Sequence, residues 1–203
     1  MKRRAVVLMM AMVAVLGLAL GRATPAYAGA ATDVVKGKQT AMFELLKQSS
    51  PANDAKLQGI FDEMLDYGSL AQASLGGEWA ARTDAEKGQF SDLLKQLVRK
   101  AWERNLKQTL NFTIEYLGEE TVDGAVMVKT KAMAKSPDAR DEPLEIAFKV
   151  GQKDATWRVQ DIVTEGVSLV SSYRSQFTKI IKKDGFPALI QKMKDKIAKG
   201  DVR

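Results

Sequence analysis

Apolar residues in the segment that follows Thr32-Asp33 recur every three or four positions, which is the spacing of an amphipathic helix. This pattern stops at Ser49-Ser50-Pro51, because helices usually end before a proline. A second helical pattern follows, for which Asn53 can serve as the N-cap. Its apolar face consists of Leu57, Ile60, Phe61, Met64 and Leu65. The sequence therefore predicts two helices in succession.

The next stretch predicts a short helix and then the longest helix of the chain. The short one, from Leu70 to Leu75, ends at Gly76-Gly77. Thr83 and Glu86 then form a capping-box pattern, in which each side chain can bond the backbone N–H of the other residue. The apolar face of the helix that this pattern opens consists of Phe90, Leu93, Leu94, Leu97, Val98, Ala101, Trp102 and Leu106.

Near Asn111 the spacing of apolar residues changes from helical to alternating, which indicates strands. Four alternating stretches follow, joined by polar connections. Their apolar positions include Phe112, Ile114 and Tyr116, then Val126 and Val128, then Leu144, Ile146, Phe148 and Val150, and finally Trp157, Val159 and Val163. Short polar connections favour an antiparallel meander with one face in water and the other face buried.

Helical spacing returns after Ser168, which can cap a helix. This helix is expected to close at Asp184-Gly185, and Pro187 suits the first turn of a last helix. The predicted fold class is α+β, with helices packed on one face of a curved four-stranded antiparallel sheet. Such layers can enclose a hydrophobic cavity, and periodicity alone does not tell whether side chains or a ligand fill it.

The N-terminus has the pattern of a secretory signal peptide. Lys2, Arg3 and Arg4 precede an uncharged apolar run from Ala5 to Gly21, and Ala26-Tyr27-Ala28 matches the small-residue cleavage pattern. The apolar run is at the short limit for a transmembrane anchor, which is the alternative interpretation. We expect residues 1–28 to be a signal peptide cleaved after Ala28, and residues 29–203 to form a single domain.

The composition excludes several classes of function. The net charge of +6 falls to +2 without the signal peptide, because four basic residues leave with it and no acidic residue does. No basic stripe carries interleaved aromatic residues, so we expect no nucleic-acid partner. The chain has no histidine and no cysteine, which excludes Ser-His and Cys-His nucleophiles and the commonest metal ligands. We therefore expect no metal, no cofactor and no catalytic residues.

Two alternatives remain from the residues themselves. Cone-shaped α+β folds can host enzymes that use a buried carboxylate and a tyrosine, and Asp161 with Tyr116 or Tyr173 fits that description. The missing histidine and the lack of a paired-carboxylate motif disfavour this reading. A periplasmic adaptor with a filled core and no ligand is the second alternative.

Two blocks of residues resemble the MlaC family, whose members are periplasmic lipid-shuttle proteins, also called toluene-tolerance proteins. The first block consists of Asp66-Tyr67, Leu70-Ala71, Leu75-Gly76, Trp79, Thr83 and Phe90. The second and more specific block consists of Trp157-Arg158-Val159, Asp161-Ile162, Glu165-Gly166-Val167-Ser168-Leu169-Val170 and Tyr173-Arg174-Ser175-Gln176-Phe177. The resemblance extends from about Val34 to Ile197.

This resemblance implies a carrier that holds phospholipid acyl tails inside the protein, leaves the headgroup outside, and needs no cofactor. It also implies two docking partners: an inner-membrane ABC transporter with a ring of MCE domains, and an outer-membrane complex of a lipoprotein with a porin. We expect a monomer located in the periplasm. A related branch of the family is associated with hopanoid transport, so a hopanoid or another lipid is the alternative cargo.

A lipid pocket needs an apolar lining, since an acyl chain exposed to water costs about 0.8 kcal/mol per CH₂. The lining expected from the sheet is Phe112, Ile114, Val126, Val128, Ile146, Phe148, Val159 and Val163. The lining expected from the helices is Tyr67, Leu70, Tyr173 and Phe177. The tryptophans are expected to be packing anchors. Asp161 lies on the same alternating face as Val159 and Val163. If it points inward it needs a partner, and the family pattern implies Arg174.

Overall fold

The computed structural model describes residues 29–48, 50–122, 125–135 and 143–200, with the backbone alone for 104–109. The expected signal peptide and the side chain of Leu106 lie outside this description. The helices are α1 (Ala30–Leu46), α2 (Pro51–Met64), α3 (Tyr67–Leu75), α4 (Asp84–Thr109), α5 (Leu169–Asp184) and α6 (Phe186–Lys199). The strands are β1 (Phe112–Val122), β2 (Ala125–Ala134), β3 (Leu144–Lys153), β4 (Thr156–Thr164) and β5 (Val167–Ser168).

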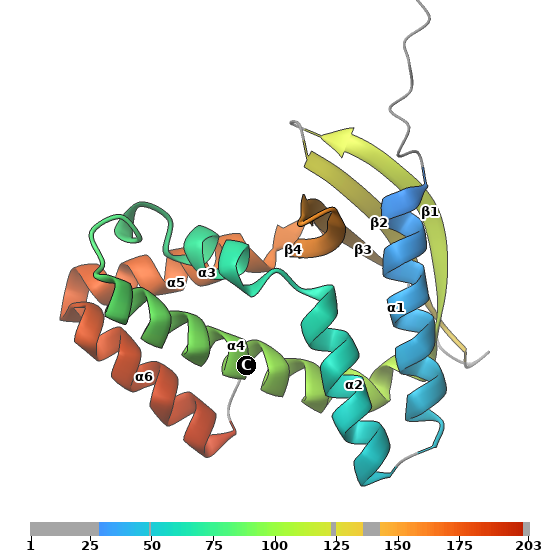
Figure 1. The fold of residues 1–203 in the computed structure, drawn as a ribbon, viewed down its shortest axis with the longest axis horizontal. Helices are drawn as coiled ribbons and strands as arrows, with labels where there is room; N and C mark the ends of the chain where they lie inside the picture. The colour runs from blue at the N-terminus through green and yellow to red at the C-terminus, as the bar shows by residue number, and fades with distance from the viewer. Residues whose placement is uncertain (1–28, 49, 123–124, 136–142, 201–203) are drawn as a thin grey trace, which may run out of the picture.

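The fold is α+β, with helices beside one face of a curved antiparallel sheet (Figure 1). Helix α1 runs along β1 and β2, whereas α2, α3 and α5 contact β4, and α4 and α6 pack with α3 and α5 into a helical layer (Figure 1). The most enclosed part of that layer surrounds Phe90, which is fully buried and contacts the rings of Phe177 and Phe186. Within the described residues, no helix is both long and apolar enough to cross a bilayer.

The sheet has the predicted meander order, β1-β2-β3-β4-β5, with one short strand more than the four expected. The added strand, β5, pairs Ser168 with Val163 and Val167 with Thr164. Glu165 and Gly166 form the two-residue connection, and both have positive φ angles, of 49° and 74°. Such angles fit the tight hairpin turn that follows the twist of antiparallel strands. The chain therefore folds back on β4 before α5 begins.

The helix boundaries follow from local capping. Thr83 and Glu86 form the predicted capping box. The backbone N–H of Thr83 donates to Glu86 Oε2 at 2.8 Å, and the backbone N–H of Glu86 donates to Thr83 Oγ1 at 3.2 Å. Ser168 caps α5 by accepting from Ser171 N. The N-cap of α2 is Ser50 rather than Asn53, because Ser50 Oγ accepts from Asn53 N. Pro51 can then occupy the first turn, where its missing N–H costs nothing.

One bulge changes which residues of β4 face the helices. Lys149 pairs with Asp161 but Val150 pairs with Val159, so Gln160 is an extra residue in β4. A one-residue insertion reverses the alternation beyond it.

Beyond the bulge, Ile162 pairs with Phe148 and Thr164 pairs with Ile146, so Ile162 and Thr164 share the face that points toward the helices. Val163 instead pairs with Ala147, which pairs in turn with the exposed Lys129. Val163 therefore lies on the face of the sheet that points away from the helices.

The predicted inward orientation of Val163 is therefore wrong. Simple alternation along β4 would place both Val159 and Val163 on the face that points toward the helices. This is correct for Val159, but Val163 lies on the other face of the sheet. The cause is the single extra residue between them.

Candidate functional site

A cavity of about 350 Å³ lies between the sheet and the helices α1, α2, α4 and α5, and it is called the central cavity below. Its described lining is Gln39, Met42, Phe61, Met64, Leu65, Val98, Ala101, Trp102, Ile146, Phe148, Ile162, Thr164, Leu169 and Tyr173. None of these described residues carries a charge at neutral pH. A space of this kind suits an apolar ligand, because a buried charge without a partner would be costly and an apolar chain gains from leaving water.

Aromatic pairs form two parts of the cavity wall. The rings of Phe61 and Trp102 stack with their centroids 4.1 Å apart, which joins α2 to α4. The Tyr173 ring stacks on Phe177 with a centroid distance of 5.3 Å. Burial raises the pKa of the Tyr173 hydroxyl, so this side chain stays neutral under ordinary conditions. Stacking therefore holds Phe61, Trp102 and Tyr173 in place as uncharged parts of the wall.

The structure brings only some of the predicted lining residues to the central cavity. Ile146, Phe148 and Tyr173 line it. Phe177, which stacks on Tyr173, lines a small cavity of about 50 Å³ among α4, α5 and α6. Tyr173 lines this small cavity as well. Phe112 and Ile114 line a different pocket, described below.

The other predicted residues are placed in the packed interior or outside it. Leu70, Val128 and Val159 are no more than 3% exposed and belong to the hydrophobic core. Val126 and Tyr67 are half-buried and pack against that core. The Tyr67 hydroxyl donates to Asp62 Oδ1 at 2.8 Å, so its polar end points to an ion-pair site and not into the central cavity.

Helices supply most of the lining that the sequence did not identify. Phe61, Met64, Val98 and Trp102 belong to the apolar faces predicted above, and Met42 lies in the first predicted helix. The structure places all five around the cavity. Their helical spacing is the signal that marks them as buried. Trp102, expected to be a packing anchor, both packs on Phe61 and lines the cavity.

The buried carboxylate of Asp161 has a structural role at the start of α5. It accepts hydrogen bonds from Ser168 Oγ at 2.5 Å and from Val170 N at 3.0 Å. The predicted pairing with Arg174 is wrong, because Arg174 Nε donates to the carbonyl oxygen of Ala73 at 2.8 Å. Asp161 is not among the described residues that line the central cavity.

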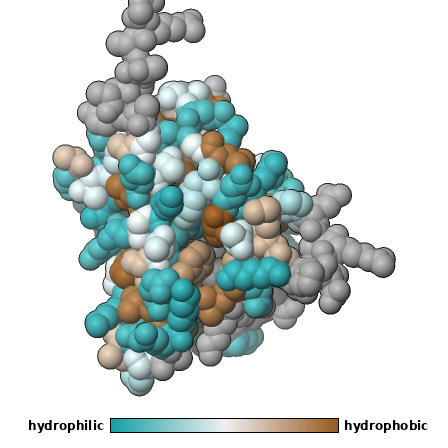
Figure 2. Space-filling model, turned by 90° about the vertical axis from the view of Figure 1, so that its right-hand side faces the viewer, coloured by the Kyte–Doolittle hydropathy of each residue, from teal (hydrophilic) through white to brown (hydrophobic). Residues whose placement is uncertain are grey.

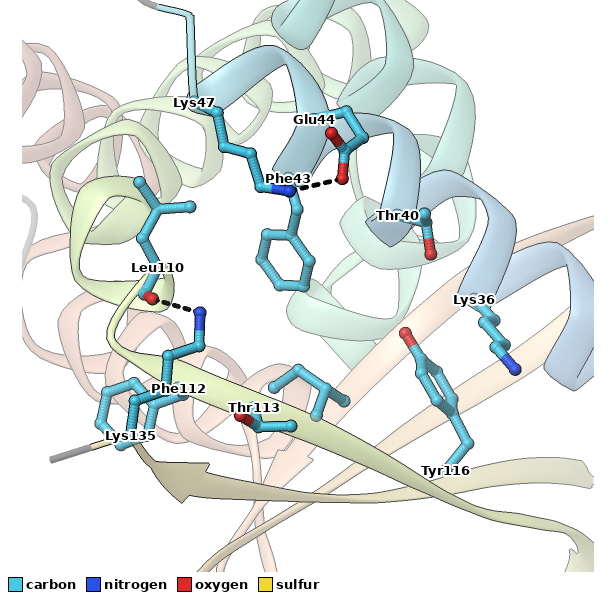
Figure 3. A pocket seen from close by; sticks show the side chains of 11 residues that line it. Lys36, Thr40, Phe43, Glu44, Lys47, Leu110, Phe112, Thr113, Tyr116 and Lys135 are labelled. Atoms are coloured by element: carbon cyan, nitrogen blue, oxygen red, sulfur yellow. Dashed lines mark hydrogen bonds and ion pairs between the residues drawn. The ribbon is translucent and has the colours of Figure 1, made fainter. Parts of the chain in front are cut away.

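A second pocket, of about 490 Å³, lies between α1 and β1 and is called the α1–β1 pocket (Figure 3). Its described lining is Lys36, Thr40, Phe43, Glu44, Lys47, Leu110, Phe112, Thr113, Ile114, Tyr116 and Lys135. On the face of the molecule that includes α1 and β1, apolar side chains are interspersed with hydrophilic ones (Figure 2).

No group of three or more acidic, histidine or cysteine side chains that could hold a metal occurs among the described residues.

Comparison with known proteins agrees with this architecture. The family model described as MlaC protein matches residues 31–195. The structure is also similar to that of the phospholipid-binding protein from Ralstonia solanacearum, which was solved in complex with a phospholipid. The two share 22% sequence identity with a TM-score of 0.68, over 84% of this chain and 98% of the other. The likeness between the structures shows a common fold, and the family match covers most of the sequence: the chain belongs to the MlaC family.

Proposed function

We propose that this protein is a lipid carrier that encloses acyl tails in the central cavity and leaves the polar headgroup outside. The observation that carries the proposal is the uncharged cavity between sheet and helices, found in a chain of the MlaC family. The related protein from Ralstonia solanacearum is described as phospholipid-binding, which favours a phospholipid over a hopanoid as the cargo. Enclosing an acyl chain is worth about 0.8 kcal/mol per CH₂, so a lined cavity is sufficient to hold a tail without a covalent bond or a cofactor.

Residues 1–28 and the cellular context complete the proposal. We infer that the chain is exported, cleaved after Ala28 and released as a monomeric single domain in the periplasm. Its expected partners are the inner-membrane ABC transporter with MCE domains and the outer-membrane lipoprotein–porin complex. A carrier of this kind performs no chemistry on its cargo, so the protein is not expected to be an enzyme. Support comes from the signal-peptide pattern and from the family.

A cavity-filling substitution tests the proposal. Ala101 lines the central cavity from α4, and Ala85 is exposed in the first turn of the same helix. Ala101→Phe should reduce the lipid that co-purifies with the protein by most of its amount, because the added ring occupies the space for the tail. Ala85→Phe is the matched control and should leave the lipid content unchanged.

Extraction of the purified proteins and quantification of lipid per mole of protein give the readout. Urea unfolding of both variants identifies any loss caused by misfolding. A folded Ala101→Phe variant with the full lipid content would contradict the assignment of the central cavity.

A further inference from the structure

The α1–β1 pocket is a separate space from the central cavity. Helix α1 lies between them: Met42 lines the central cavity, and the next residue, Phe43, lines the α1–β1 pocket. The Tyr116 hydroxyl donates to Gln39 Oε1 at 2.5 Å. Because Gln39 lines the central cavity and Tyr116 lines the α1–β1 pocket, this hydrogen bond lies on the boundary between the two.

The chemistry of the pocket differs from that of the central cavity. Phe43 points from α1 toward β1, and together with Phe112 and Ile114 it gives the pocket an apolar interior (Figure 3). Lysines stand around this interior. Lys36 and Lys47 lie toward opposite ends of the pocket, and Lys135 lies beside Leu110 (Figure 3).

Lys36, Lys47 and Lys135 are called the rim of the pocket, and their positive charge is only partly neutralised. Lys47 Nζ contacts Glu44 Oε1 at 2.7 Å. Lys36 Nζ lies 5.6 Å from the centroid of the Tyr116 ring, and Lys135 Nζ donates to the carbonyl oxygen of Leu110 at 2.8 Å. Among the ion pairs of the described residues, none involves Lys36 or Lys135. Within the part of the chain that the structure describes, two cations without a carboxylate partner therefore flank an apolar space.

An apolar interior with a cationic rim is complementary to an amphiphile whose head is anionic. The interior removes an acyl chain from water, and the lysines favour a phosphate or carboxylate at its end. A neutral or cationic head would gain nothing from the rim. We propose that the α1–β1 pocket is a second lipid site of this protein, which binds one acyl chain with an anionic head. This inference does not depend on the cargo of the central cavity.

Two single-chain probes with the same tail test the inference. Dodecyl phosphate carries an anionic head and dodecyl maltoside carries a neutral one; both are titrated below their micelle concentrations into protein that lacks residues 1–28. Isoleucine methyl NMR reports on each space separately, because Ile114 lines the α1–β1 pocket and Ile146 lines the central cavity. The Ile114 methyl signal should shift saturably with dodecyl phosphate, and less tightly with dodecyl maltoside.

The double variant Lys36→Glu/Lys135→Glu tests the role of the rim. It should weaken the binding of dodecyl phosphate measured at Ile114 by roughly threefold to tenfold, the effect expected for two exposed charge contacts. The binding measured at Ile146 should not change. Equal affinities of wild type and variant at Ile114 would overturn the proposed recognition of an anionic head.

A pair of neighbouring substitutions tests the space itself. Thr40 lines the α1–β1 pocket, whereas the adjacent Ala41 is exposed and is not among its lining residues. Thr40→Trp should abolish the Ile114 shift, and Ala41→Trp should leave it as in wild type. If dodecyl phosphate shifts Ile146 but leaves Ile114 unmoved in wild type, the second site does not exist, while the proposal for the central cavity stands.

Inorganic phosphate distinguishes a lipid head from a free anion. At the concentrations that saturate dodecyl phosphate binding, phosphate alone should neither shift the Ile114 signal nor compete with the amphiphile. An equal shift with phosphate alone would show an anion site without a tail site, and it would overturn the inference.

Discussion

The Tyr116 hydroxyl donates a hydrogen bond of 2.5 Å to Gln39 Oε1, and these two side chains line different cavities, both of which α1 helps to form. The contact ties the N-terminal helix to the first strand of the sheet across 77 positions of sequence. Helix α1 thereby acts as the partition between the central cavity and the α1–β1 pocket.

Removing this hydrogen bond should destabilise the fold measurably. Tyr116→Phe keeps the ring but leaves Gln39 without its hydroxyl partner, so we expect the free energy of unfolding to fall by about 1 kcal/mol. Urea unfolding monitored by circular dichroism measures the change. An unaltered midpoint and slope would show that the contact contributes nothing to stability.

Alkaline pH should also destabilise the protein. Burial raises the pKa of Tyr116 from 10.0 to about 12, and burial raises the pKa of Tyr67 and Tyr173 as well, with the Glu103 carboxylate adding to the effect at Tyr67. Above pH 10 the unfolded chain loses these protons while the folded chain keeps them. The unfolded state then binds fewer protons, so the free energy of unfolding falls as the pH rises from about 10 toward 12.

Two measurements test the loss of stability at alkaline pH. The urea midpoint should be lower at pH 11 than at pH 9, and the decrease should be smaller in Tyr116→Phe. Tyrosinate absorbance of the folded protein without residues 1–28 should appear only well above pH 10. Titration of all three remaining tyrosines near pH 10 in the folded protein would contradict the burial shown here.

The bulge at Gln160 predicts opposite behaviour for two adjacent residues of β4. Ile162 lines the central cavity, whereas Val163 lies on the other face of the sheet. Ile162→Trp should therefore lower the amount of bound lipid, because the larger ring enters the cavity. Val163→Trp should leave it near the wild-type amount. Lipid extraction from both variants measures the difference, and the reverse result would mean that β4 has the unbroken alternation.

Trp102 should report directly on occupation of the central cavity. Of the three tryptophans, only Trp102 is among the described residues that line it. Delivery of phospholipid to lipid-free protein should change the tryptophan fluorescence, since a tail against the indole replaces water or empty space. The change should persist in Trp79→Phe and disappear in Trp102→Phe. A signal that survives in Trp102→Phe would place the ligand elsewhere.

Local sequence signals were sufficient for most of the fold. Capping residues such as Thr83, Glu86 and Ser168 act within three or four positions, so their roles can be read from neighbouring residues. The two-residue strand β5 is too short to show a period. The extra residue Gln160 leaves no periodic signal in the sequence, so simple alternation gives the wrong orientation for Val163.

The candidate site was less predictable than the fold. Periodicity identifies the buried side of each element, but only packing in three dimensions decides whether the space there is filled. Val128 and Phe148 alternate in the same way in neighbouring strands, yet Val128 is fully packed and Phe148 borders the central cavity. The partners of Asp161 likewise follow from the turn that brings Ser168 and Val170 back to β4.

Native mass spectrometry of the gently purified protein, with lipid extraction alongside, tests the carrier function itself. We expect a mass that corresponds to a chain beginning at Gly29 with a bound phospholipid, which the Ala101→Phe variant should lose. A hopanoid in its place would keep the carrier function and correct the cargo. Protein that is free of lipid in several gentle preparations would contradict the carrier function and favour an adaptor without a ligand.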